Sequence, residues 1–181
     1  MALNPLLDSR DQRFVLFEAL EADKLNRYER FADFDRDTYE ATLDLAEQIA
    51  VEQVYPANAQ ADKTGATYDP AAKTVKVPEG FHAAMKSYRE AGFSGLSNSP
   101  EFGGTGMPET VYRAAMEYFC AAGVAFSSYD TLKVGACNLI IHHGSEELKK
   151  IYVEKMVAGQ WGGTMCLTEP SAGSDVGALK T

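Results

Sequence analysis

The residues best suited to ligand chemistry lie near the end of the 181-residue chain, between positions 161 and 175. From 161 to 168, large apolar side chains alternate with small polar ones, which is the period of two expected of a β-strand. Glu169 and Pro170 end this pattern, because proline has no N–H to donate to a sheet. The following residues, 171–175, are small, so several backbone amides can point at one phosphate group.

Two interpretations of this stretch stay open from the residue types alone. A flat strand face joined to an amide-rich turn can hold a planar ring and its phosphates, so a dinucleotide cofactor is one candidate ligand. The alternative is a strand that ends in an ordinary turn, in which Gly173 only supplies a permissive backbone.

Other residue types that commonly carry chemistry form no site by their spacing. His142 and His143 are adjacent, so on a helix they point about 100° apart. With the distant His82 they make no convincing zinc triad, and no serine occupies a nucleophile elbow. Three widely spaced cysteines are expected as reduced, mostly buried thiols: Cys120, Cys137 and Cys166.

Composition indicates an ordinary globular protein, with 45% hydrophobic and 24% charged residues. Seventeen basic against twenty-six acidic residues give a net charge of −9, which disfavours nucleic acid or an anionic membrane as the main partner. No signal peptide and no apolar run long enough to span a membrane is evident, so we expect a cytoplasmic protein.

The elements that must position the end of the chain are mostly helices. Residues 10–22 form a helix that we expect to pack on the chain, to stay loose or to pair with another copy. A linker over 23–35 precedes a helix that Asp37 and Glu40 cap and that Pro56 kinks or breaks. A small hairpin or extended loop then covers 62–78.

The second half of the chain continues with helices. One helix runs from 78 to 91 with Gly92 as its C-terminal cap, and a glycine-rich loop over 94–107 leads to another helix that opens at Pro108. A helix over 126–142 is apolar enough to predict full burial, and Ser145 caps the last helix. The fold class is therefore all-α: a helical bundle followed by one strand, which lacks partners and must be disordered, paired or folded onto the helices.

The order of residues near the end of the chain resembles a known family. Cys166-Leu-Thr-Glu-Pro-Ser-Ala-Gly-Ser-Asp175, followed by Gly177, is similar to the motif that starts the middle domain of the FAD-dependent acyl-CoA dehydrogenases. Upstream segments resemble successive landmarks of the family's helical N-terminal domain, at 91–93, 101–108, 144–149 and 152–161. The opening, 5–17, is similar to the leader of a long-form subgroup that includes the methylthiopropanoyl-CoA dehydrogenases.

This resemblance implies a division of the chain. Residues 1–35 correspond to a leader helix and linker, 36–159 to the helical N-terminal domain, and 160–181 to the start of a truncated middle β domain. Family members run to several hundred residues and add a C-terminal four-helix domain, which carries the catalytic glutamate. We therefore expect this chain by itself to lack the catalytic base, to hold FAD weakly and to be inactive.

The resemblance also implies a reaction and a set of site residues. The family removes two hydrogens across the Cα–Cβ bond of an acyl-CoA thioester: a carboxylate takes the α-proton, the β-hydrogen leaves as hydride to FAD, and electron-transfer flavoprotein reoxidises the cofactor. Thr168 is expected at the isoalloxazine edge, Ser174 near the phosphate-bearing portion of the CoA ligand, and Phe102 on a wall of the acyl cavity. The residues implied to contact the cofactor are Met165, Cys166, Leu167, Thr168, Gly173 and Ser174.

Alternatives remain at this point. An acyl-CoA oxidase shares the implied fold but passes its electrons to oxygen. A non-catalytic helical module that associates with itself or docks on a partner is the alternative from another functional class. If the dehydrogenase interpretation holds, the resemblance implies a homo-oligomer as well.

Overall fold

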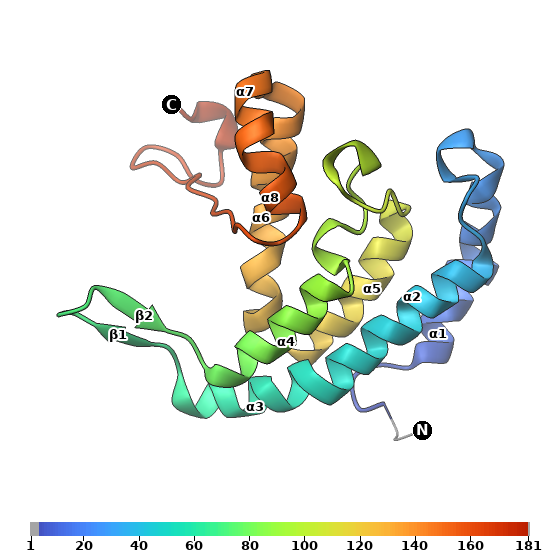
Figure 1. The fold of residues 1–181 in the computed structure, drawn as a ribbon, viewed down its shortest axis with the longest axis horizontal. Helices are drawn as coiled ribbons and strands as arrows, with labels where there is room; N and C mark the ends of the chain where they lie inside the picture. Colours follow the sequence, from blue (N-terminus) through green and yellow to red (C-terminus); the bar gives the residue numbers. More distant parts are fainter. Residues whose placement is uncertain (1–3, 181) are drawn as a thin grey trace.

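The computed structural model describes residues 4–180, which form a helical bundle in two parts (Figure 1). The first part holds α1 (Ser9–Arg13), α2 (Arg36–Ile49), α3 (Tyr55–Thr64), α4 (Glu79–Glu90) and α5 (Glu109–Ala122). The second part holds α6 (Val124–His143), α7 (Glu146–Leu148) and α8 (Glu154–Val157). This arrangement confirms the predicted all-α class.

Short 3₁₀ and π segments connect or extend these helices. The π segments are Phe14–Ala19 after α1, Ala50–Val54 between α2 and α3, and Lys149–Val153 between α7 and α8. The 3₁₀ segments are Ala22–Arg27, Glu29–Phe31, Phe93–Gly95, Pro100–Phe102 and Val176–Ala178.

The start of α2 differs from the prediction by two residues. Asp35, not Asp37, is the N-cap: its backbone is extended, and its carboxylate accepts a hydrogen bond from the Thr38 N–H at 2.8 Å. Asp37 lies inside the first turn, where the helix dipole favours a carboxylate but where the residue cannot act as the cap. The predicted Glu40 capping box is therefore wrong.

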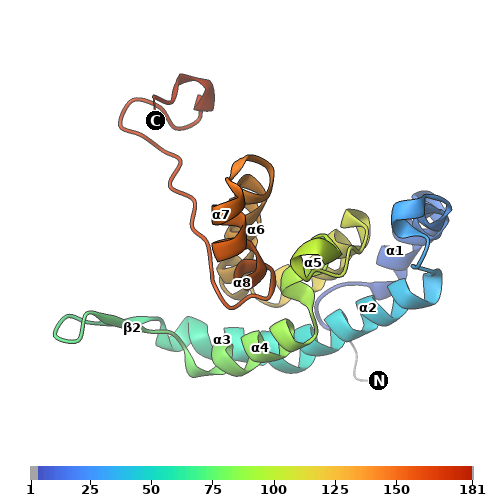
Figure 2. The ribbon, with the colours of Figure 1, turned by 45° about the horizontal axis from the view of Figure 1, so that its top comes forward.

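Of the two predicted effects of Pro56, a kink or a break of the helix, the break does not occur. The chain stays helical from α2 through the π turn Ala50–Val54 into α3, and Pro56 lies in the first turn of α3. A π turn shifts the hydrogen-bond ladder by one residue, so the missing proline N–H falls where the ladder is already interrupted. Figure 2 shows α2 and α3 as one long element along the bottom of the molecule.

The larger hydrophobic core lies between α2, α4, α5 and the first turns of α6. Its centre is an aromatic cluster in which the Phe119 ring lies 4.9 Å from both the Tyr88 and the Phe93 ring, centroid to centroid. Edge-to-face pairs of this kind contribute about 0.5–1.5 kcal/mol each beyond their buried area. Phe126 of α6 joins the same cluster through Tyr88.

The smaller core lies between α6 and α8, and α6 is only partly buried. Cys137, Val153, Met156 and Val157 form this second cluster. The predicted full burial of α6 is wrong, because Leu132 is 42% and Leu139 63% exposed. Only one side of α6 packs on the described chain, so its other side presents leucines to the surface.

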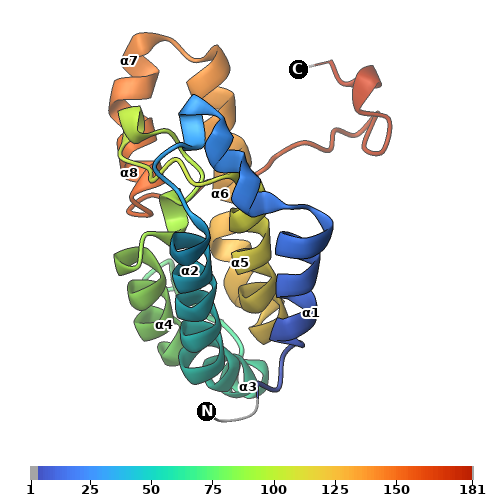
Figure 3. The same ribbon diagram turned by 90° about the vertical axis from the view of Figure 1, so that its right-hand side faces the viewer.

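The leader is docked on the bundle (Figure 3). Gln12 Nε2 donates to the Ala114 carbonyl of α5 at 2.9 Å. Arg13 donates to Glu40 of α2 and to the Tyr118 hydroxyl of α5, both at 2.8 Å. The leader thus packs within the chain, in agreement with the first of the three predicted possibilities.

Two segments project from the helices (Figure 2). The predicted hairpin is confirmed: β1 (Thr67–Asp69) pairs antiparallel with β2 (Thr74–Lys76). The end of the chain differs from expectation, because residues 161–168 have no regular secondary structure and no ladder partner within 4–180. Over 160–180 the single bridge joins Glu169 to Ala172.

Two further observations concern the chain as a whole. Between residues 4 and 180, no helix is both long and apolar enough to cross a membrane. All three cysteines are free thiols, but only Cys137 is buried, so the prediction of mostly buried thiols is wrong for Cys120 and Cys166.

Candidate functional site

The C-terminal segment that carries the predicted site residues starts with backbone packed closely against the bundle. A β-carbon on Gly163 would lie 2.9 Å from the Lys133 Cα and 3.0 Å from the Ala136 Cβ, so the segment leaves the bundle in direct contact with α6. Just before it, the Trp161 ring lies 5.6 Å from the Tyr152 ring, and the Lys155 ammonium lies 4.2 Å from the Trp161 ring centroid. Aromatic and cation–π contacts therefore hold the start of the segment.

Beyond Gly163 the predicted flavin-contacting residues are exposed. Met165 is 58% and Leu167 44% exposed, and Cys166 and Thr168 are also on the surface. Met165 lies over Gly135 of α6, where a β-carbon would be 3.9 Å from the Met165 Cε. The structure therefore leaves these side chains exposed, with Met165 lying against α6.

A tight turn follows at 168–174. Glu169 N–H donates to the Ala172 carbonyl at 2.8 Å, and Ala172 N–H donates back at 3.2 Å. Within the described chain, no hydrogen bond uses the backbone N–H of Ser171, Gly173 or Ser174. These amides, with the two serine hydroxyls, fit the donor set that a phosphate of a dinucleotide requires.

Phe102, the predicted acyl-cavity residue, lies in the loop between α4 and α5. Its half-buried ring packs against the small core of α6 and α8. Gly163 adjoins the same core, since a β-carbon there would be 3.3 Å from the Met156 Cε. The structure thus brings the loop of Phe102 and the root of the C-terminal segment to one cluster.

A buried polar network at this junction was missed from the sequence. Lys133 Nζ lies 2.9 Å from Asp130 Oδ1 and donates to the Ser94 carbonyl at 2.7 Å. Asp130 also accepts from the Ser94 hydroxyl at 3.0 Å and from the Tyr88 hydroxyl at 3.1 Å. Burial and the neighbouring Asp130 carboxylate raise the pKa of Tyr88 far above its ordinary value, so the phenol stays protonated and donates. The signal in the sequence was an aspartate and a lysine three apart on a helix that has no other Asp, Glu, Lys or Arg.

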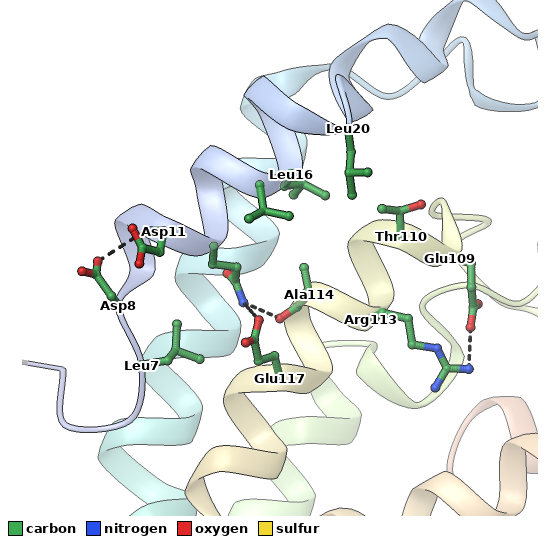
Figure 4. A pocket seen from close by; sticks show the side chains of 12 residues that line it. Leu7, Asp8, Asp11, Leu16, Leu20, Glu109, Thr110, Arg113, Ala114 and Glu117 are labelled. Carbon is green, nitrogen blue, oxygen red and sulfur yellow. Dashed lines mark hydrogen bonds and ion pairs between the residues drawn. The ribbon is translucent and has the colours of Figure 1, made fainter.

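A groove lies elsewhere, between the leader and α5 (Figure 4). It has a volume of about 720 Å³ and an apolar floor that includes Leu7, Leu16 and Leu20. Its charged side chains are largely engaged within the chain: Arg113 pairs with Glu109 at 2.7 Å, and Glu117 accepts from Gln12. The groove holds no nucleophile beside a base, so it offers no reactive constellation of its own.

The histidines form no metal site in the part of the chain that the structure describes. The His142 and His143 rings lie 6.4 Å apart at the end of α6, as expected of adjacent helical residues. No group of three or more potential ligands from residues 4–180 is placed to hold a metal ion.

Comparison with known proteins gives consistent matches. A family model described as acyl-CoA dehydrogenase, N-terminal domain, matches residues 36–160. The broad-specificity linear acyl-CoA dehydrogenase FadE5 of Mycobacterium tuberculosis is 37% identical over 172 residues, which cover 95% of this chain and 28% of that protein. A butyryl-CoA dehydrogenase of Syntrophomonas wolfei is 36% identical over 180 residues, with 98% and 29% covered.

A third relative belongs to the subgroup that the opening of the chain resembles. The 3-methylmercaptopropionyl-CoA dehydrogenase of Ruegeria pomeroyi is 30% identical over 171 residues, which cover 94% of this chain and 29% of that protein. The chain thus spans less than a third of the length of these relatives.

Proposed function

The chain belongs to the acyl-CoA dehydrogenase family, and we propose that it is the N-terminal part of an FAD-dependent enzyme that oxidises the Cα–Cβ bond of an acyl-CoA thioester. The observation that carries this proposal is the match of residues 36–160 to the family's N-terminal domain. Three relatives that are named acyl-CoA dehydrogenases, each aligned over more than nine-tenths of the chain, support it.

The roles proposed for the site residues rest on their exposure and on the chemistry of the segment. Bound FAD would supply the electron chemistry of the reaction. Met165, Leu167 and Thr168 would line the ring, since their side chains are exposed and Met165 lies over Gly135 of α6. The amides and hydroxyls of the turn, with Gly173 and Ser174, would bind phosphate.

On the substrate side, Phe102 would form part of the wall against the acyl chain, because its ring is fixed against the small core of α6 and α8. The catalytic base is proposed to lie outside residues 1–181. Electron-transfer flavoprotein as electron acceptor, assembly into a homo-oligomer and a cytoplasmic location belong to the same proposal. Residues 1–35, 36–159 and 160–181 would be the leader, the helical domain and the start of the β domain.

Anaerobic reductive titration of the full-length protein tests this function. We expect a yellow protein whose flavin absorbance is bleached by an acyl-CoA and restored by electron-transfer flavoprotein. A purified protein without flavin, or a flavin that no acyl-CoA reduces, would contradict the proposal. Rapid reoxidation by oxygen in place of electron-transfer flavoprotein would instead identify an acyl-CoA oxidase.

A further inference from the structure

The buried ion pair between Asp130 and Lys133 has no role in the function proposed so far. Their side chains are only 7% and 2% exposed, so both charges have lost nearly all contact with water. Desolvation of such a pair costs as much as or more than the attraction returns, and apolar residues of similar size often replace it without loss of stability. Stability alone therefore gives no reason for these residues at this point in an apolar helix.

The position of the pair indicates what it does. Along α6, Asp130 and Lys133 lie between Phe126, which belongs to the larger core, and Cys137, which belongs to the smaller one. Their hydrogen bonds reach Tyr88 of α4 and both the hydroxyl and the carbonyl of Ser94. The network thus joins the two parts of the bundle through directional hydrogen bonds. Apolar contacts alone would let α6 shift along α4 and the loop of Ser94.

Three close backbone contacts converge on the same place. A β-carbon on Gly95 would lie 2.7 Å from a Val157 methyl group, and one on Gly159 would lie 2.4 Å from the Ser94 hydroxyl. Gly163 lies directly on the backbone of Lys133. The network therefore holds Ser94 of the loop 93–107, which carries Phe102. Ser94 in turn packs against Gly159, at the root of the segment that carries residues 165–174.

We propose that Asp130 and Lys133 are positioning residues, whose ion pair sets the distance between the loop of Phe102 and the C-terminal segment and thereby the acyl-chain length that the site accepts. This inference rests on the proposed function for its consequence in catalysis. The positioning of the loop and of the segment root by the ion pair does not depend on that function, because it involves only residues of this chain.

The test replaces the pair by apolar residues of similar size, Asp130→Leu with Lys133→Met, in the full-length protein. We expect the variant to fold, while amide hydrogen exchange in peptides covering 93–107 and 159–165 becomes faster by on the order of tenfold. The ratio of kcat/KM between a short and a long acyl-CoA should shift by about tenfold. One methylene more or less in an apolar pocket changes kcat/KM by about that factor. Glu109→Gln with Arg113→Met, at an exposed ion pair of α5, is the matched control and should change neither measurement.

A milder variant keeps the test decisive if the double replacement does not fold. Ser94→Ala removes the hydroxyl bond to Asp130 and leaves the ion pair intact, so exchange should rise in 93–107 and the kcat/KM ratio should shift in the same direction. Wild-type exchange and an unchanged ratio, or an equal loss of activity for all chain lengths, would overturn the proposal. If the wild-type protein dehydrogenates no acyl-CoA, the proposed function fails, and the exchange measurement alone decides the positioning role.

Discussion

At the scale of single residues, the adjacent glycines Gly162 and Gly163 differ in the space around them. A β-carbon at Gly163 would meet backbone and side-chain atoms of α6 at 2.9–3.0 Å, whereas one at Gly162 would meet nothing within 4 Å. We expect Gly163→Ala to lower the free energy of unfolding by about 1–3 kcal/mol, because overpacking forces the segment off the helix. Chemical denaturation measures this change.

Gly162→Ala is the control one residue away. It should leave the free energy of unfolding within about 1 kcal/mol of the wild type, since alanine also restricts the unfolded chain. Equal effects of the two substitutions would contradict the close contact between Gly163 and α6. In the full-length protein, Gly163→Ala should also weaken flavin retention more than Gly162→Ala does.

The cysteines give a second prediction at this scale. Burial raises the pKa of the Cys137 thiol, and the thiolate is the reactive form, so Cys137 should resist thiol reagents. Cys120 and Cys166 are exposed and should react in the native protein. Titration with an aromatic disulfide should therefore find two reactive thiols before and three after unfolding, and a native count of three would contradict the burial of Cys137.

At the scale of the elements, the sequence predicted helices better than it predicted their burial. Periodicity and the Gly92 and Ser145 caps located α4 and the start of α7, because these signals are local. The burial of α6 depends on which neighbours cover it, and a uniformly apolar helix does not show which of its faces is covered. Leu139 was accordingly expected inside and is exposed.

In the candidate site too, the sequence predicted local features but not contacts between distant residues. The motif at 166–175 identified the segment, and the turn at 169–172 forms within it, because proline and small residues act locally. The strand expected before the turn needs a partner strand that residues 4–180 do not supply. The Asp130–Lys133 network depends on Ser94 and Tyr88, which are distant in sequence, so spacing along the chain could not predict it.

The N-terminus of α2 gives a prediction about pH. Hydrogen bonds from the Thr38 hydroxyl and N–H lower the pKa of Asp35, so its contribution to stability is present above the unfolded pKa of about 3.9 and is lost as the pH falls through the lower folded value. We expect Asp35→Ala to lower the Tm at neutral pH, by an amount that shrinks below about pH 4. Thermal unfolding followed by circular dichroism across this range measures it.

Asp35→Asn separates the cap from the charge. Asparagine caps nearly as well as aspartate, so this variant should keep most of the wild-type Tm at neutral pH and lose the pH dependence. A decrease in Tm for Asp35→Ala that stays constant down to pH 2 would show that the carboxylate makes no special contribution at the cap.

At the scale of the whole molecule, one face of α6 exposes apolar side chains. Leu132 and Leu139 of α6 are exposed there, and Met165, which is 58% exposed, lies over Gly135 of the same helix. Surfaces of this kind are usually covered by other protein or by a ligand. The relatives are more than three times as long as this chain, so in them other parts of the protein are available to complete the site.

The exposure of this face leads to a prediction about flavin binding. If residues 165–174 bind FAD as proposed, the isolated 181-residue chain offers the cofactor exposed side chains and backbone amides but little enclosure. Ligand sites in proteins bury most of the ligand's surface. We expect the purified chain to be colourless, to retain no FAD through gel filtration and to reduce no dye with an acyl-CoA. The full-length protein, purified in parallel, should carry flavin in proportion to its chains. Stoichiometric flavin on the isolated chain would mean that residues 4–180 already enclose the cofactor, and would require the exposed segment to fold back onto α6.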